Sequence, residues 1–237
     1  MMKSPKHTLV IVAFTTLVSC SSPGVPATMP DTPAQALRLF ATSATLPLVT
    51  DLTGAYGDKQ LTFETQSSNF QSALTSLLEG GETSYLFTTH LPPPETLTAR
   101  LWAAPIGQDG IAVIVNPINT VTNLSLDQLR EIYQGRVSNW QELGGQNSEL
   151  VIFSREDTSD TRAEFERLVM GQRRTTLAAQ LIVNSSGMID AVANTPGGIG
   201  YVSLAFINQS NQRVQPLKIQ GIEPTPAAIL EDRYPLR

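Results

Sequence analysis

The sequence predicts an α/β fold built on a mainly parallel sheet, and three observations lead to that prediction. From about residue 35 onward, short apolar runs of strand length alternate with amphipathic stretches of helical period. Several of the predicted helices begin with hydroxyl residues directly after a strand. The length of 237 residues suits one large α/β domain or two smaller lobes, each with a core.

Each predicted strand is a short apolar run. In chain order these runs are Leu37–Ala41, Leu61–Thr65, Tyr85–Thr88, Ile111–Asn116, Leu150–Ser154, Leu181–Asn184 and Ile199–Leu204. Four helices are predicted between them, because apolar residues recur there at steps of three and four. Their apolar stripes are Leu48, Leu52, Tyr56; Phe70, Leu74, Leu78; Leu126, Leu129, Ile132; and Phe165, Leu168, Val169, the last stopped by Gly171.

Composition excludes several classes of function. The chain carries 16 basic and 21 acidic residues with no Lys/Arg cluster, so a nucleic-acid partner is not expected. One Cys cannot form an internal disulfide or a thiolate zinc cluster, and two His make a multi-His metal centre unexpected. We therefore expect no metal and no cofactor.

The N-terminus has the pattern of a targeting segment. Lys3 and Lys6 precede an uncharged apolar stretch about half as long as a membrane-spanning helix, and this stretch runs into Leu17-Val18-Ser19-Cys20. The pattern resembles a bacterial lipobox, which implies a signal peptide at 1–19 and lipidation of Cys20. Residues 20–34, rich in Pro, would form a tether to the folded part, so the protein is expected in the periplasm or on the extracytoplasmic face of a membrane.

Three helix starts suggest a binding site for an anion. Hydroxyl residues open the predicted helices at Thr42–Thr45, Ser67–Ser68 and Thr158–Thr161, each after a strand. Open α/β sheets bind ligands at that edge, where helix N-termini offer N–H groups and partial positive charge. Arg155 lies just before the third start and could supply a guanidinium fork. These residue types indicate a binder of small anions rather than a catalyst.

Residues 104–145 carry a resemblance to a known family. They contain an apolar strand ending in Val115-Asn116-Pro117, then a Leu-rich helix, an Asn139-Trp140 pair and a Gly144-Gly145 turn. Two further blocks follow, at 154–161 and at 195–202. In this order the blocks resemble the PstS-like phosphate-binding proteins of ABC importers, which belong to the periplasmic binding proteins.

The resemblance implies a two-lobed type II periplasmic-binding-protein fold with a hinge of two crossing strands. Lobe one would comprise residues 35–113 plus 201–237, and lobe two residues 114–200. The crossings would lie near Ile111–Asn116 and Gly198–Val202.

The resemblance also implies a ligand-binding set. Leu46 follows the first Thr and would add its backbone N–H. Five positions agree with the family in residue type, and they are Thr45, Ser67, Arg155, Ser159 and Thr161.

Two positions depart from the family pattern. Thr89 stands where the family has an Asp that accepts a proton from phosphate, and Asp160 stands where the family has a Gly. A carboxylate facing a bound oxyanion at about 4 Å would cost about 4 kcal/mol. Both orientations of Asp160, toward the ligand and toward solvent, are open at this point.

The resemblance implies a non-enzymatic, monomeric solute-binding lipoprotein that passes a small oxyanion, with phosphate favoured, to an ABC permease. The alternative is an envelope protein of the same fold whose pocket is degenerate, acting as a sensor or accessory module. A hydrolase would need a catalytic His, and His90 on a Pro-rich turn is the only His beyond the predicted leader.

Overall fold

The computed structural model describes residues 35–57, 61–79, 84–91, 101–210 and 212–237. All of them fall within one unit, Ala34–Arg237. The predicted signal peptide, Cys20 and the tether lie outside the described residues.

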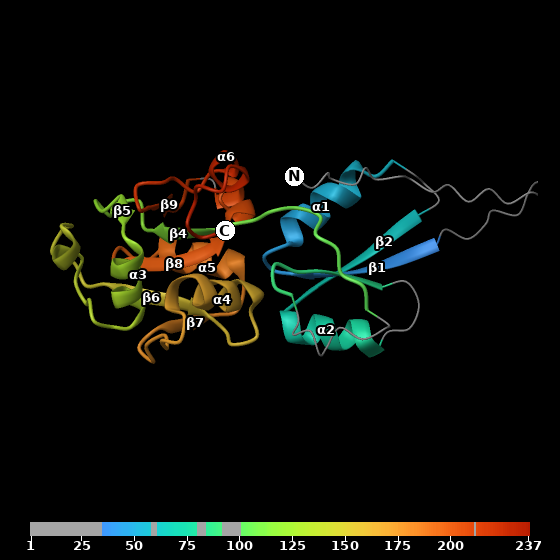
Figure 1. Cartoon of the computed structure of the whole chain (residues 1–237), viewed down its shortest axis with the longest axis horizontal. Helices are drawn as coiled ribbons and strands as arrows, with labels where there is room; N and C mark the ends of the chain where they lie inside the picture. The colour runs from blue at the N-terminus through green and yellow to red at the C-terminus, as the bar shows by residue number, and fades with distance from the viewer. Residues whose placement is uncertain (1–34, 58–60, 80–83, 92–100, 211) are drawn as a thin grey trace, which may run out of the picture. The chain divides into compact units, whose positions relative to one another are not determined.

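The first sheet has three parallel strands in the order β2-β1-β3. Its strands are β1 (Gln35–Thr42), β2 (Leu61–Ser68) and β3 (Ser84–Phe87), and its helices are α1 (Leu46–Ala55) and α2 (Phe70–Glu79). A parallel neighbour requires a crossover connection, and α1 supplies the one between β1 and β2. The two helices lie on opposite faces of the sheet (Figure 1).

The second sheet has five strands in the order β7-β6-β8-β4-β9. They are β4 (Ile111–Val115), β6 (Val151–Arg155), β7 (Gln180–Ile182), β8 (Gly198–Ser203) and β9 (Gln215–Pro216). β6 pairs in parallel with β7 and β8, whereas β4 runs antiparallel to β8 and β9. A separate parallel pair joins β5 (Asn123–Leu124) to β10 (Lys218–Ile219).

The helices around the second sheet are α3 (Leu126–Tyr133), α4 (Asp160–Phe165), α5 (Ser185–Ala193) and α6 (Pro226–Leu230). A π-helical turn, Glu166–Met170, continues α4, and 3-10 turns cover Trp140–Leu143, Leu204–Phe206 and Asn208–Ser210. Residues of α3 and α4 lie in one apolar cluster with residues of β6 and β8, and Figure 1 shows both helices beside this sheet.

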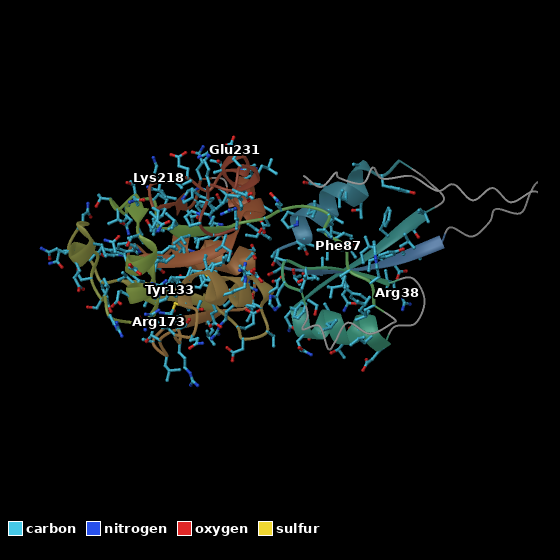
Figure 2. All side chains as sticks on the ribbon, viewed as in Figure 1. Arg38, Phe87, Tyr133, Arg173, Lys218 and Glu231 are labelled. Carbon is cyan, nitrogen blue, oxygen red and sulfur yellow. The ribbon has the colours of Figure 1, made fainter. Side chains whose placement is uncertain are left out.

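The second sheet is buried on both faces. Along β4, Ile111, Val113 and Val115 point into one apolar cluster, while Ala112 and Ile114 point into another. In the first cluster Tyr133 of α3, labelled in Figure 2, packs with its ring centroid 4.6 Å from that of Phe165. This two-sided packing explains why the β4 run is continuously apolar in sequence.

All seven predicted strands and all four predicted helices are present, and five of the seven strand pairs among the described residues are parallel. The α/β prediction is therefore confirmed. The strands β5, β9 and β10 have two residues each and gave no recognisable pattern. Helices α5 and α6 were also missed.

The C-terminal segment packs differently from the expectation that residues 201–237 belong with the first lobe. Leu217, Ile219, Ile229 and Tyr234 lie in the same buried cluster as Trp140, beside the second sheet. The lobe boundaries stay a prediction, and this packing argues against placing the C-terminal segment in lobe one.

The two predicted crossing segments are neighbours in the second sheet. They form the antiparallel pair β4–β8, with Ile111 opposite Ser203 and Val115 opposite Ile199. Their function as a hinge stays a prediction.

Candidate functional site

A cavity of about 310 Å³ lies where strand ends of both sheets meet helix N-termini. Most of its lining residues carry hydroxyl or amide groups. The lining residues are Thr42, Ser43, Ser67, Ser68, Asn69, Arg155, Glu156, Ser159, Asp160, Val183 and Asn184. The cavity is therefore rich in neutral hydrogen-bonding groups, and its formal charges are one positive and two negative.

The Arg155 side chain is 2% exposed and is neutralised by its neighbour. Its Nε and Nη2 atoms donate to the two carboxylate oxygens of Glu156, each at 3.0 Å. Nη2 also donates to the Ser43 hydroxyl at 3.1 Å, and Nε donates to the Ile182 carbonyl at 2.9 Å. A bidentate ion pair of this kind fixes the plane of the guanidinium. Nη1 has a longer contact, 3.4 Å, to the Ser185 hydroxyl.

Tyr201 contacts the backbone of Arg155. The backbone N–H of Arg155 donates to the Tyr201 hydroxyl at 3.3 Å, and the Ser154 hydroxyl lies 3.0 Å from the same oxygen. The Tyr201 ring stacks on Phe165 with centroids 4.0 Å apart. Burial raises the pKa of Tyr201 to about 12, so the phenol is neutral at physiological pH. The Tyr201 hydroxyl, with its ring packed on Phe165, therefore fixes the C-terminal end of β6.

Asp160 points toward the first sheet. Its side chain is buried, and its Oδ2 atom accepts hydrogen bonds from the hydroxyls of Thr42 at 2.6 Å and Thr89 at 3.0 Å. The backbone N–H of Thr89 donates to the same oxygen at 3.1 Å. Its other oxygen, Oδ1, accepts from the N–H of Thr161 at 2.8 Å. Of the two orientations that the sequence left open, the structure has the inward one.

The predicted first-lobe residues divide into two groups. Ser67 lines the cavity. Thr45 and Leu46 do not: the Thr45 hydroxyl donates to the carbonyl of Phe87, labelled in Figure 2, at 2.8 Å. Thr89 is not among the lining residues either, and it is engaged with Asp160.

The predicted residues around α4 lie together. Ser159 lines the cavity and caps α4, where its hydroxyl accepts from the N–H of Arg162 at 3.3 Å. Asp160 also lines the cavity, whereas Thr161 is buried beside it. Arg155, Glu156, Ser159 and Asp160 therefore form one side of the cavity.

Two of the three predicted hydroxyl caps are not hydroxyl caps. Thr45 precedes α1 without a capping hydrogen bond from its side chain. At α2 the cap is Asn69, whose side chain accepts from the Ser72 N–H at 2.9 Å, while Ser67 and Ser68 are the last residues of β2. At α3, Ser125 and Gln128 form a capping box. Asn and hydroxyl side chains cap helices about equally well. The sequence alone therefore did not show which of several adjacent polar residues forms the cap.

The start of α5 was not predicted from the sequence. Asn184 caps this helix and lines the cavity, and the Ser185 hydroxyl lies 3.3 Å from that of Ser43. The signal was present, because Asn184 ends a predicted strand, Ser185 follows it, and Met188, Ile189 and Val192 have helical spacing. Glu156 was also missed as the partner of Arg155.

Two further contacts join the first sheet's loops and helices to those around α4. His90 Nδ1 lies 2.8 Å from Glu164 Oε1, and its ring packs edge-on against Phe70. The Phe70 N–H donates to the Thr158 carbonyl at 3.2 Å. His90 is thus a tertiary contact residue in this structure.

Two further properties concern only the described residues. Within them, no helix is both long and apolar enough to cross a membrane. The same residues contain no group of three or more His, Cys, Asp or Glu side chains arranged to hold a metal ion.

Solved structures support the fold. A protein from Clostridium perfringens, assigned as a phosphate ABC transporter substrate-binding protein and solved with bound phosphate, aligns with a TM-score of 0.77 at 26% identity, covering 85% of this chain and 83% of that one. An ABC-type phosphate transport receptor from Vibrio cholerae aligns with a TM-score of 0.65 at 22% identity, over 85% of this chain and 83% of its own. The expected two-lobed periplasmic-binding-protein fold is therefore confirmed.

The sequence relatives are also phosphate-binding proteins, and they match a shorter stretch of this chain. The phosphate-binding protein PstS of Bacillus subtilis is 32% identical over 128 residues, 54% of this chain and 41% of that protein. PstS of Borreliella burgdorferi is 25% identical over 137 residues, 54% of this chain and 49% of its own. The chain thus spans less than half of these relatives' length.

The family model for the PBP superfamily domain matches residues 27–237, which include every described strand and helix. The chain therefore belongs to the PBP superfamily, and its relatives there are PstS-like phosphate-binding proteins.

Proposed function

We propose that this chain is a solute-binding protein that captures a small oxyanion, with phosphate as the first candidate, for an ABC importer. The observation that carries the proposal is the cavity of about 310 Å³, in which hydroxyl and amide groups surround one buried Arg. Dehydrated oxyanions are bound by such donors at helix N-termini and strand ends. The printed names of the relatives, which describe phosphate binding, support the choice of phosphate.

Neutral donors would do most of the binding. Glu156 already balances the charge of Arg155, so the guanidinium would contribute its remaining directional N–H groups more than a net positive charge. The hydroxyls of Ser43 and Ser67 and the amides of Asn69 and Asn184 lie around it. A net charge of −5 for the chain is therefore compatible with anion capture.

The cellular setting is part of the same proposal. Lipidation at Cys20 would anchor the protein at the extracytoplasmic face of a membrane, with residues 21–34 as a tether. From there it would pass its ligand to an ABC permease as a monomer without enzymatic activity. The sequence pattern at residues 3–20 supports the anchor.

A second candidate function is favoured by Asp160. This carboxylate accepts the hydrogen bonds that the Thr42 and Thr89 hydroxyls could otherwise donate to a ligand. If a side chain of the protein itself occupies the anion-binding groups, the pocket would be degenerate. The protein would then be an envelope sensor or accessory module, the alternative named from the sequence.

Isothermal titration of the full chain with phosphate, and with sulfate for comparison, tests the proposal. We expect saturable heat with phosphate that is lost in Arg155→Gln and kept in the control Arg136→Gln, an exposed Arg that is also paired with a Glu. Absence of heat at millimolar phosphate in both the parent and Asp160→Gly would overturn oxyanion capture. Heat in Asp160→Gly alone would favour the second candidate.

A further inference from the structure

We propose that Asp160 is a built-in anion, a carboxylate that occupies the oxyanion-binding groups of the first sheet and that an incoming ligand has to displace. It would thereby lower the affinity of the cavity for anions. The displacement part rests on the proposed function, whereas occupation of the donors does not.

The contacts of Asp160 Oδ2 carry the inference. The Thr42 hydroxyl lies at 2.6 Å, the Thr89 hydroxyl at 3.0 Å, the Thr89 N–H at 3.1 Å and the Thr88 hydroxyl at 3.4 Å. All four donors stand at or just beyond the carboxyl ends of β1 and β3, 71 to 118 residues away from Asp160 in sequence. Hydroxyl and N–H donors that converge on one negatively charged oxygen are the environment that a bound oxyanion requires.

Burial makes this occupation strong. Asp160 is 2% exposed and Thr42 is 1% exposed, so water does not compete effectively for these donors. Oδ1 is held by the Thr161 N–H at the first turn of α4, which fixes the direction of Oδ2. A carboxylate with charge-assisted hydrogen bonds on both oxygens is a stable occupant of the donors.

The charge distribution gives the consequence for ligands. Asp160 lines the cavity together with Glu156, and the Arg155 guanidinium is already paired. A dianion in the cavity would face an uncompensated carboxylate, and it could gain the Thr42 and Thr89 donors only if Asp160 released them. Asp160 would thus weaken the binding of any anion that does not displace it from these donors.

Two other contacts also connect segments of the first sheet to α4 and the loop before it. Any experiment must distinguish their effects from that of Asp160. They are the His90–Glu164 pair and the hydrogen bond from the Phe70 N–H to the Thr158 carbonyl. Neither uses the Thr42 or Thr89 donors. A readout at the Thr89 N–H is therefore specific for Asp160.

Hydrogen exchange of the ligand-free full chain, followed by mass spectrometry on peptides containing Thr89, tests occupation directly. We expect exchange of the Thr89 amide to become about tenfold faster or more in Asp160→Gly, because its charged acceptor is gone. Asp160→Asn keeps the side-chain shape and should give a smaller increase, which guards against misfolding of the Gly variant. The matched control is Asp127→Gly, which removes an exposed carboxylate from the first turn of α3.

Titration of the same variants with phosphate tests displacement. Loss of the competing charge should lower the Kd for phosphate about tenfold or more in Asp160→Gly, with no change in Asp127→Gly. Unchanged exchange at Thr89 in both Asp160 variants would overturn the inference whatever phosphate does. Faster exchange without phosphate binding in any variant would support occupation by Asp160 and would refute oxyanion capture. Faster exchange with equal phosphate affinities would overturn displacement.

Discussion

Arg155 and Asp160 both line the cavity, and they differ in the groups that balance their charges. Arg155 is balanced by a neighbouring carboxylate, while Asp160 is balanced by neutral donors only. Charges that are buried without an ionic partner must be hydrogen-bonded, and the Thr hydroxyls meet this need. At the scale of residues, the orientation of the Thr42 and Thr89 hydroxyls therefore decides how the buried charge of Asp160 is held.

Asp109 provides a prediction at the same scale. Burial raises the pKa of Asp109 above its ordinary value of 3.8, hydrogen bonds from Ser203 and from the backbone of Gly110 and Leu204 oppose the rise, and the negative charge of Asp160 adds to it. The folded state therefore binds this proton more tightly than the unfolded state does. The resulting stability is fully present below pH 3.8 and is lost as the pH rises through the raised pKa.

We expect Asp109→Asn to raise the free energy of unfolding at neutral pH relative to the parent and to flatten its decline with rising pH. Urea unfolding at a series of pH values from about 4 to 8 measures this. Asp127→Asn, at a position whose side chain is 88% exposed, is the control. Parallel pH curves for parent and Asp109→Asn would contradict the assignment.

At the scale of elements, the junction between β6 and β8 depends on a Gly. The Gly197 carbonyl accepts hydrogen bonds from the Val151 N–H at 3.0 Å and from the Trp140 indole at 2.9 Å. A Cβ at this position would lie 1.8 Å from the Glu149 carbonyl oxygen, which belongs to backbone and cannot rotate away. The close approach of the two chain segments, and with it the end of β6 that precedes the cavity, requires this residue to lack a side chain.

We expect Gly197→Ala to lower the free energy of unfolding by about 1–3 kcal/mol, because the strands must move apart to admit the methyl group. Gly54→Ala is the matched control, since a Cβ on this helical Gly meets nothing within 4 Å. That control should be neutral or stabilising by up to about 1 kcal/mol. Chemical unfolding of both variants decides the matter, and equal midpoints for Gly197→Ala and the parent would refute the steric argument.

At the scale of the whole molecule, the described core is divided unevenly between the two sheets. Leu39, Ala41 and Val49 are the buried members of the first sheet's cluster. The second sheet has a large cluster on each face, with Val113 and Ile114 of β4 in opposite ones. Since buried apolar area is the main source of stability, the two sheets should differ in how readily they open.

We expect native-state hydrogen exchange to be faster in β1 and β2 than in β4 and β8 at low denaturant. The first sheet would open as a separate unit at a free energy below that of global unfolding. Exchange measured by mass spectrometry across a urea series would show two classes of amides. A single class that merges at the same denaturant concentration in all four strands would show instead that the sheets unfold together.

The sequence by itself determined the local structure of this protein. Apolar runs such as residues 111–115 and stripes such as Leu126, Leu129 and Ile132 identify strands and helices, because burial selects for the period of the element. Elements too short to show a period, such as β9, escaped detection for the same reason. The order of motifs around residues 104–202 was enough to indicate the family, which the family model and the solved structures bear out.

Only the tertiary structure decided which residues meet. Asp160 was equally compatible with capping α4 toward solvent and with facing the cavity, and its orientation depends on donors at Thr42 and Thr89 that lie far away in sequence. Thr45 fitted the family pattern but donates to the Phe87 carbonyl, since β3 brings that acceptor beside it. Side-chain direction is set by the nearest partner in space, and local sequence carries no record of a partner that the fold supplies.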